Sequence, residues 1–214
     1  MSARSKLLPI CLTVACSADA PGPGVTASTG PYFSEPMFFN QDVSGEPAAA
    51  ESQQVIGSLR AAGGWGNSDR MTIDFGFAVL DADETTPMRT FSPNDAFKLP
   101  DCDMVPMPVP IAGHVEGEYS YKCEGGGDCH LIVNDAHAGK LYEMWKADIK
   151  SSLQFNGGCL AVWDTKKAYG ETLRGDQCTS ADGAGLPIAP LLFSADEVAS
   201  GELDHAIRFV LPKD

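Results

Sequence analysis

Short apolar runs separated by glycine and proline dominate residues 71–164, and this pattern constrains the fold more than any other feature. In "MTIDFGFAVLD" (71–81), apolar residues recur at every second position from Ile73 to Val79, which is the period of a half-buried β-strand. The 22 glycines and 15 prolines supply frequent turns between such runs. We therefore expect a mainly β fold, an antiparallel β-sandwich or a jelly-roll-like arrangement, with one or two short helices.

Two hairpins are expected in the middle of this region. Residues 116–123 and 130–135 have the pattern of strands on either side of a glycine loop, and 140–147 is expected to pair back through the turn "DAHAG". A further hairpin is expected over 151–164, with Asn156-Gly157 as its turn, because this dipeptide favours tight hairpin connections.

Helices are expected near the two ends of the chain. One should start at Ser44 or Glu46 and run to about Ala62, where a glycine pair ends it. Another of one or two turns should follow Ser194, which can form a capping box with Glu197. The remaining strand candidates are the proline-rich run 104–111, at an edge or surface crossing, and the final run 205–211.

Residues 1–15 have the features of a secretory signal peptide: basic residues, then a short apolar stretch, then small residues before a cleavage point. The apolar stretch is too short to span a bilayer. "LTVAC" also fits a bacterial lipoprotein signal, in which Cys16 becomes the lipidated first residue; the alternative is plain secretion. Residues 16–36 are expected to form a flexible tether and 37–214 a single β-rich domain, at the bacterial outer surface or in the periplasm.

Export makes the later cysteines candidates for disulfide bonds. Cys123 and Cys129 flank a glycine loop, so a local bridge is expected there. Cys159 could then pair with Cys178, which would leave Cys102 over. A zinc site is a weaker interpretation because the chain has no CxxC pair.

The formal net charge of −14 argues against two kinds of partner. A nucleic-acid-binding protein needs a clustered basic patch, and none is visible. The acidic surface also disfavours adhesion to anionic lipid, so we expect membrane contact only through a lipid on Cys16.

No standard catalytic or nucleotide-binding motif is present. The candidate functional residues are instead a few polar side chains that are scattered along the sequence. Asp128 and His130 are two positions apart and share a strand face, while His205 opens the last expected strand. Asp182 or Asp128 could orient an imidazole as general base or acid. The same four groups could instead hold a metal, or each histidine could simply be hydrogen-bonded at a strand end. The residues identify no cofactor.

Aromatic side chains offer a further interpretation. They could form a sugar-binding face, because aromatic rings stack on the C–H faces of pyranoses; the alternative for each is core packing. The candidates are Trp65, Trp145, Trp163, Tyr119, Tyr121 and Tyr142.

Several blocks resemble an uncharacterised group of exported bacterial β-rich proteins. These are "GDCH" (127–130), "TSADGAGLPI" (179–188) and "DEVASGELDHAIRF" (196–209), with weaker matches at "NQDVSG", "LYE" and "CLAVWD". The resemblance covers about residues 36–212 and implies a secreted β-rich domain, often near carbohydrate- or envelope-related modules. It implies no catalytic residue, but it groups Asp128, His130, Ser180, Asp182 and His205 as one candidate set.

From these features we expect an exported, lipid-anchored, carbohydrate-active surface protein with a His/Asp cleft, acting as a polysaccharide hydrolase or lyase. A non-catalytic module that binds a glycan or a protein of the cell envelope is the alternative. A purely structural envelope protein, whose polar residues only cap strands, is the third. The expected partner in the first two cases is a polysaccharide or another envelope component.

Overall fold

The structure is a computed structural model that describes residues 29–64, 73, 76–175 and 181–209. The expected signal peptide, Cys16, Trp65, Cys178 and Ser180 lie outside these residues. Within them, no helix is both long and apolar enough to cross a bilayer.

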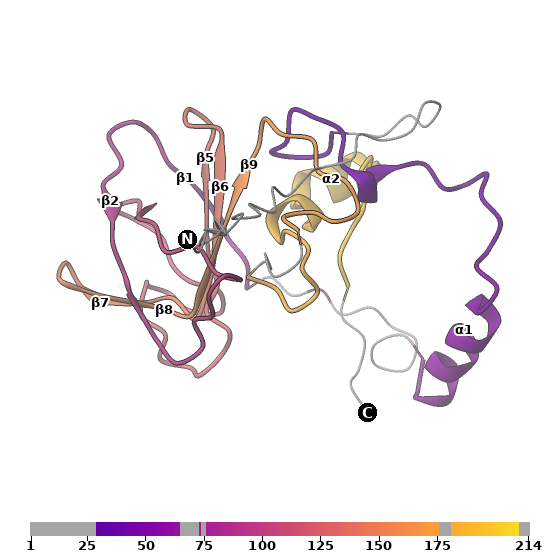
Figure 1. The fold of residues 1–214 in the computed structure, drawn as a ribbon, viewed down its shortest axis with the longest axis horizontal. Coiled ribbons are helices and arrows are strands. Elements are labelled where there is room, and N and C mark those ends of the chain that lie inside the picture. The colour runs from indigo at the N-terminus through magenta and orange to yellow at the C-terminus, as the bar shows by residue number, and fades with distance from the viewer. Residues whose placement is uncertain (1–28, 65–72, 74–75, 176–180, 210–214) are drawn as a thin grey trace, which may run out of the picture.

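Strands form three sheets, and the largest lies at the centre (Figure 1). Its order is β1-β5-β6-β9, with β5 and β6 and then β6 and β9 antiparallel and β1 parallel to β5. The bounds of these strands are Val79–Asp81 (β1), Leu131–Asp135 (β5), Lys140–Trp145 (β6) and Cys159–Asp164 (β9). The hairpin of β5 and β6 through residues 136–139 is the one that the sequence predicts.

Two smaller sheets lie on one side of the central one. The first has the order β3-β8-β7 and the second pairs β2 with β4. Their strands are β2 (Met88–Arg89), β3 (Ser92–Pro93), β4 (Met107–Pro108), β7 (Asp148–Ser151) and β8 (Gln154–Gly157). The mainly β class with two short helices is confirmed, although β3 also pairs parallel to β8. A sandwich or jelly-roll arrangement stays a prediction.

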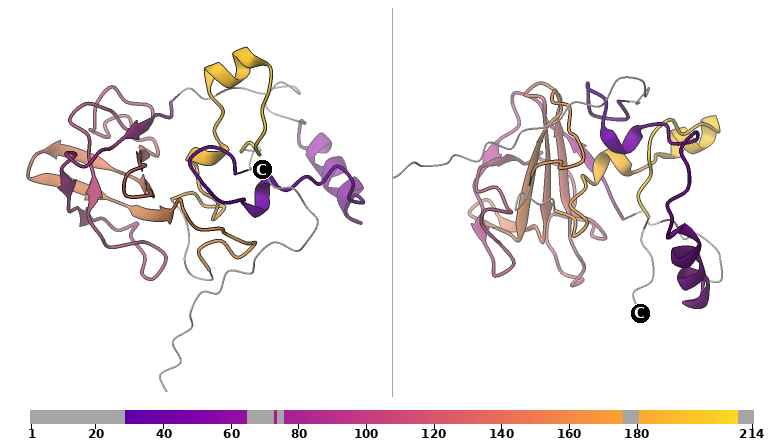
Figure 2. Two further views of the ribbon diagram at one scale, coloured as in Figure 1. Left: turned by 90° about the horizontal axis from the view of Figure 1, so that it is seen from above. Right: turned by 45° about the vertical axis from the view of Figure 1, so that its right-hand side comes forward.

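The central sheet is buried on both faces, because successive side chains of its strands enter two different cores. Leu131 and Val133 of β5 pack with the core on the side of β7 and β8, whereas Ile132 packs on the other side. That second core includes Phe33, so the packed part of the chain reaches into the segment expected to be a tether. Figure 2 shows the C-terminal segment on this second side, opposite the smaller sheets.

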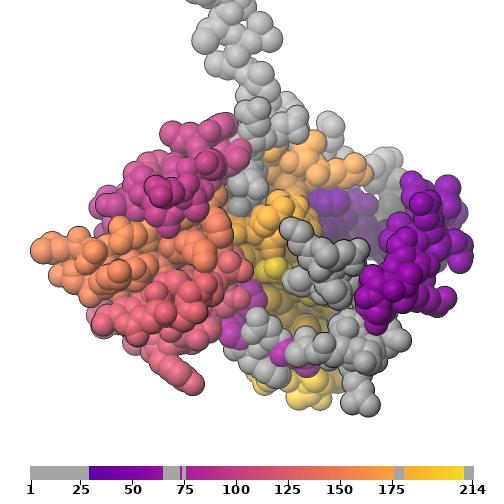
Figure 3. All heavy atoms as spheres, turned by 90° about the horizontal axis from the view of Figure 1, so that it is seen from below, coloured from indigo at the N-terminus to yellow at the C-terminus, as the bar shows by residue number. Residues whose placement is uncertain are grey.

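The helix near the N-terminus is shorter than the sequence predicts, whereas the helix near the C-terminus begins where it is predicted. Helix α1 spans Ser52–Ala61 and starts later than predicted; Pro47 has no amide hydrogen to donate and disfavours helical backbone at Glu46. Helix α2 spans Ala195–Ser200 and begins with the predicted capping box of Ser194 and Glu197. In Figure 3, α1 protrudes from the side of the molecule away from the strands. The 3-10 turns are η1 (Phe38–Asn40) and η2 (Ala189–Leu191).

The expected strand over 116–123 is absent: the segment forms turns and bends. The physical reason is that β1 occupies the edge of β5 on which this segment would pair. The segment does make one backbone hydrogen bond next to β5, in which the Glu116 amide donates to the His130 carbonyl at 2.9 Å. The described part of the final run, 205–209, is likewise not a strand, and its Arg208 amide donates to the Leu191 carbonyl instead.

The turn predicted at Asn156-Gly157 is wrong, because both residues lie inside β8 and the chain turns at Ser152 and Leu153. Gly157 serves close packing instead. A Cβ atom there would overlap the Met144 sulfur, at a separation that real contacts do not reach. The glycine therefore lets β8 approach the central sheet.

Two disulfide bonds tie loops to the central sheet. The predicted bond between Cys123 and Cys129 is confirmed. The other bond joins Cys102 to Cys159, so the predicted pairing of Cys159 with Cys178 and the unpaired Cys102 are wrong. Strands β4 to β8 all lie between these two cysteines in the chain, and no local signal marks the contact.

Candidate functional site

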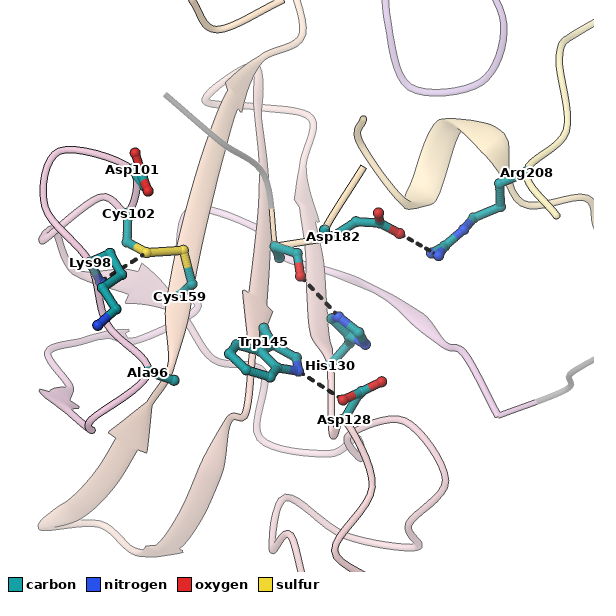
Figure 4. Close-up of a pocket in the computed structure, with 12 residues that line it drawn as sticks. Ala96, Lys98, Asp101, Cys102, Asp128, His130, Trp145, Cys159, Asp182 and Arg208 are labelled. Atoms are coloured by element: carbon teal, nitrogen blue, oxygen red, sulfur yellow. Dashed lines mark hydrogen bonds and ion pairs between the residues drawn. A yellow bond between two sulfur atoms is a disulfide. The ribbon is translucent and has the colours of Figure 1, made fainter. Parts of the chain in front are cut away.

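A pocket of about 410 Å³ opens where the start of β5, the end of β6 and the start of β9 meet two loops (Figure 4). The first loop is 96–102 and the second is 181–183, and Arg208 closes the wall beside the second. The lining residues are Ala96, Lys98, Asp101, Cys102, Asp128, His130, Trp145, Cys159, Ala181, Asp182, Gly183 and Arg208.

Asp128 and Trp145 form one side of this pocket. The Trp145 indole Nε1 donates to Asp128 Oδ1 at 2.9 Å, and this contact is drawn in Figure 4. The backbone holds the pair in register, because the Lys146 amide donates to the Asp128 carbonyl at 2.9 Å. Asp128 remains 62% exposed, so its carboxylate stands at the rim. Trp145 lines the pocket and also packs, partly buried, against the second core, as its place on the Leu141 face of the strand favours.

His130 lies deeper, with its side chain 8% exposed, and both ring nitrogens face acceptors. Nδ1 lies 2.5 Å from Glu116 Oε2, and Nε2 lies 3.2 Å from the Ala181 carbonyl oxygen. A carboxylate in this position orients the imidazole. The Ala181 contact also fixes the second loop against the start of β5. Asp128 does not act as its partner: the expected carboxylate is supplied by Glu116.

Asp182 and Arg208 form the far wall. Their side chains make an ion pair, with Arg208 Nη2 donating to Asp182 Oδ2. Asp182 Oδ1 also accepts the Ala184 amide at 2.6 Å, which shapes the loop as an Asx turn. The guanidinium carbon lies 5.6 Å from the centroid of the Phe77 ring, and Nη1 has no hydrogen-bond partner among the described residues.

His205 lies apart from this pocket. Its side chain is fully buried, and Nε2 lies 2.9 Å from Glu197 Oε1 while Nδ1 lies 2.7 Å from the Ala206 carbonyl. It therefore ties α2 to the C-terminal segment instead of joining His130. The structure brings together Asp128, His130 and Asp182 from the candidate set, and places His205 elsewhere; Ser180 lies outside the described residues.

Glu143 is the buried carboxylate behind the pocket, and the sequence offered it only as part of the "LYE" block. It is on β6 between Leu141 and Trp145 and has no exposed surface. Oε1 accepts the amides of Ile188 and Ala189, both at 2.7 Å, and Oε2 accepts Trp163 Nε1 at 3.1 Å. Burial raises the pKa of Glu143 to about 7, although these three donors and the charge of His130 act in the opposite direction.

The remaining wall is formed by the first loop and the Cys102–Cys159 disulfide. Lys98 and Asp101 bring one charge of each sign to it, and neither side chain has an ion pair with another described residue. Among the described residues, no group of three or more His, Cys, Asp or Glu side chains could hold a metal ion.

The other aromatic candidates are distributed between core and solvent. Trp163 is fully buried and Tyr142 nearly so, which supports core packing for both. Tyr119 is fully exposed, and Tyr121 donates from its hydroxyl to the Pro110 carbonyl at 2.8 Å. None of these four lines the pocket described above.

No protein-family model, curated protein or solved structure matches this chain.

Proposed function

We propose that this protein is an exported envelope module whose pocket binds a saccharide unit of a polysaccharide. The observation that carries the proposal is the position of Trp145, a half-buried indole in a pocket of about 410 Å³ that charged side chains also line. An aromatic ring provides an apolar surface for sugar C–H groups, while the surrounding side chains can bond to hydroxyl groups.

The polar groups of the pocket have the chemistry that hydroxyl recognition needs. Asp128 Oδ1 is engaged by the indole, and its Oδ2 has no hydrogen bond to another described residue, so it can accept from a ligand hydroxyl. Lys98 can donate, and Asp101 can accept. The rigid elements on which these groups stand, a sheet and two loops fixed by a disulfide and ion pairs, favour a preformed site.

Binding should depend on the indole. We expect Trp145→Ala to weaken the affinity for a bound oligosaccharide by at least about tenfold, because the variant loses the stacking surface. Isothermal titration calorimetry with oligosaccharides selected on a glycan array measures the change. Tyr119→Ala is the matched control, because it removes an aromatic that is fully exposed and outside the pocket. Equal affinities of Trp145→Ala and wild type, with both proteins folded, would refute the proposal.

A polysaccharide hydrolase or lyase is the second candidate, and the His130–Glu116 pair favours it. Such a carboxylate-oriented imidazole could act as a general base only after Nε2 leaves the Ala181 carbonyl, to which it is hydrogen-bonded in this structure. Chromatography of polysaccharides after incubation separates the candidates: a binding module leaves them intact, whereas an enzyme releases shorter or unsaturated products. If product appears, His130→Asn should abolish it; turnover that survives this change would exclude His130 as the base.

The proposal of export has one structural support. Two disulfide bonds suggest an oxidising environment. We propose further that the mature chain is anchored through a lipid on Cys16. Mass spectrometry of the protein from the membrane fraction tests this, and an unmodified Cys16 would count against it.

A further inference from the structure

We infer that Glu143 is a positioning residue for the pocket: its carboxylate holds the segment 181–191 on the central sheet and thereby sets where Ala181, Asp182 and Gly183 stand. The consequence for saccharide affinity rests on the function proposed above. The positioning itself does not, and it can be measured without a ligand.

The first step is the direct contact between carboxylate and segment. Glu143 Oε1 accepts two consecutive amides, from Ile188 and Ala189, at 2.7 Å each. Both amides belong to a fully buried stretch in which Ile188 and Ala189 pack into the second core. Without an acceptor, two buried N–H groups would be left unsatisfied, which a folded chain avoids.

The second step connects this stretch to the pocket. Seven residues before Ile188, Ala181 places its carbonyl oxygen 3.2 Å from His130 Nε2. Ala181, Asp182 and Gly183 then line the pocket directly. The segment is thus fixed at both ends, to β6 through Glu143 and to the start of β5 through His130.

Glu143 and the proposed stacking residue Trp145 belong to the same strand. Glu143 and Trp145 are two positions apart on β6, so their side chains lie on the same face of the sheet. Glu143 therefore fixes the opposite wall relative to the indole on which a sugar would stack.

The groups around Glu143 allow its ionisation to be followed. From the start of β5, His130 acts on it through its charge, and from β9 only the neutral Trp163 indole bonds it. Beyond that indole lie Tyr169, in edge contact with the ring, and Arg174, which is paired with Asp103. The segment itself contributes amides at Ile188 and Ala189 and the Asp182–Arg208 pair farther along.

Ionisation of Glu143 should loosen the segment. Burial raises the pKa of Glu143 from 4.5 to about 7 in the closed state, so a state in which the segment lifts and water reaches the carboxylate is increasingly favoured as the pH rises from about 4.5 to about 7. For one proton the ratio of lifted to closed states can rise by up to about tenfold per pH unit. In Glu143→Gln the amide oxygen can still accept both backbone N–H groups, whereas the amide NH2 cannot accept from the Trp163 indole. The glutamine has no proton to lose near neutral pH, so the cost of that lost bond does not depend on pH.

Hydrogen exchange of the Ile188 and Ala189 amides, corrected for intrinsic rates, tests the inference in the full chain. In the wild type, protection should fall by up to about tenfold per pH unit between about pH 4.5 and about pH 7 and then level off; in Glu143→Gln it should not change with pH. Glu143→Leu, which has no acceptor, should lose at least about tenfold in protection at every pH. Ile149→Ala, which damages the core on the other face of the sheet, is the control for general destabilisation.

The same proteins separate this inference from the proposed function. We expect oligosaccharide affinity to be lower wherever the Ile188 and Ala189 amides are less protected, in Glu143→Leu as in Glu143→Gln. In Ile149→Ala the affinity should be unchanged. If the exchange protection of the Ile188 and Ala189 amides had the same pH dependence in wild type and Glu143→Gln, the inference would be overturned, whether or not the protein binds a saccharide. Normal pH-dependent protection without any saccharide binding would leave Glu143 as a positioning residue and remove the proposed function.

Discussion

Replacing Cys102 and Cys159 by alanine is expected to lower the free energy of unfolding by about 4 kcal/mol. The bond closes a loop with a sequence separation of 57, and a cross-link restricts the unfolded chain more as its loop grows. The bond also connects the first pocket loop to β9, so its loss should weaken saccharide binding as well. Urea denaturation, with the m-value compared between proteins, measures the change.

Replacing Cys123 and Cys129 provides the matched control for this prediction. Their sequence separation is 6, so the same argument gives a loss of about 2 kcal/mol. A larger loss from the short loop than from the long one would contradict the loop-entropy account. An equal m-value in both variants would show that the comparison concerns stability alone.

Glu143 should give the protein a stability that falls as the pH rises from about 4.5 to about 7. The pKa is raised from 4.5 to about 7 in the fold, so the folded state holds a proton that the unfolded state has released. This contribution is fully present below about pH 4.5 and is lost as pH rises through about 7. The total change is about 3 kcal/mol, because a tenfold difference in proton affinity between the folded and unfolded states corresponds to about 1.4 kcal/mol.

The difference between wild type and Glu143→Gln isolates that contribution, because other titrating groups are common to both proteins. We expect the stability of the wild type relative to this variant to decrease by about 3 kcal/mol from acidic to mildly alkaline pH. Carboxyl groups with pKa values below the ordinary range, such as Asp164, act in the opposite direction and at lower pH. A constant difference across the range would show that Glu143 is not buried as an acid in the folded protein.

Local sequence signals predicted the elements that depend on neighbours along the chain. The short apolar run before the turn at 136–139 identified β5 and, through that turn, β6, and the Ser194–Glu197 spacing identified the start of α2. The disulfide between Cys123 and Cys129 belongs to the same class, because a loop of this length brings its ends together unaided. In each case the partners are few residues apart.

Pairings between distant segments could not be predicted in this way. Nothing local shows that β1 takes the edge of β5, which is why the sequence predicts 116–123 there. The Asn-Gly dipeptide is a sound turn signal, but close approach to Met144 places Gly157 in a strand. Likewise, His205 does have the carboxylate partner that a buried histidine needs, but it is Glu197 from the neighbouring helix.

The candidate site could be predicted in part. Asp128, His130 and Asp182 line one pocket, but the expected strand face shared by Asp128 and His130 is wrong, because β5 begins only at Leu131 and Cys129 between them has a φ of 50°. Glu116 and Arg208 were missed as partners because their contacts join distant loops. Glu143 did carry a signal: a carboxylate inside an apolar strand, on the face of Leu141, must find donors when that face is buried.

The most direct test of the central claim is an NMR titration that follows the indole N–H of Trp145. The chain has three tryptophans, and Trp145→Phe assigns the signal by its loss. We predict that an oligosaccharide which binds will shift this signal, with little effect on the buried Trp163 indole, and that Asp128→Asn will change the shift. Saturable binding that leaves the Trp145 signal unmoved, or no binding by any oligosaccharide on a broad array, would contradict the account.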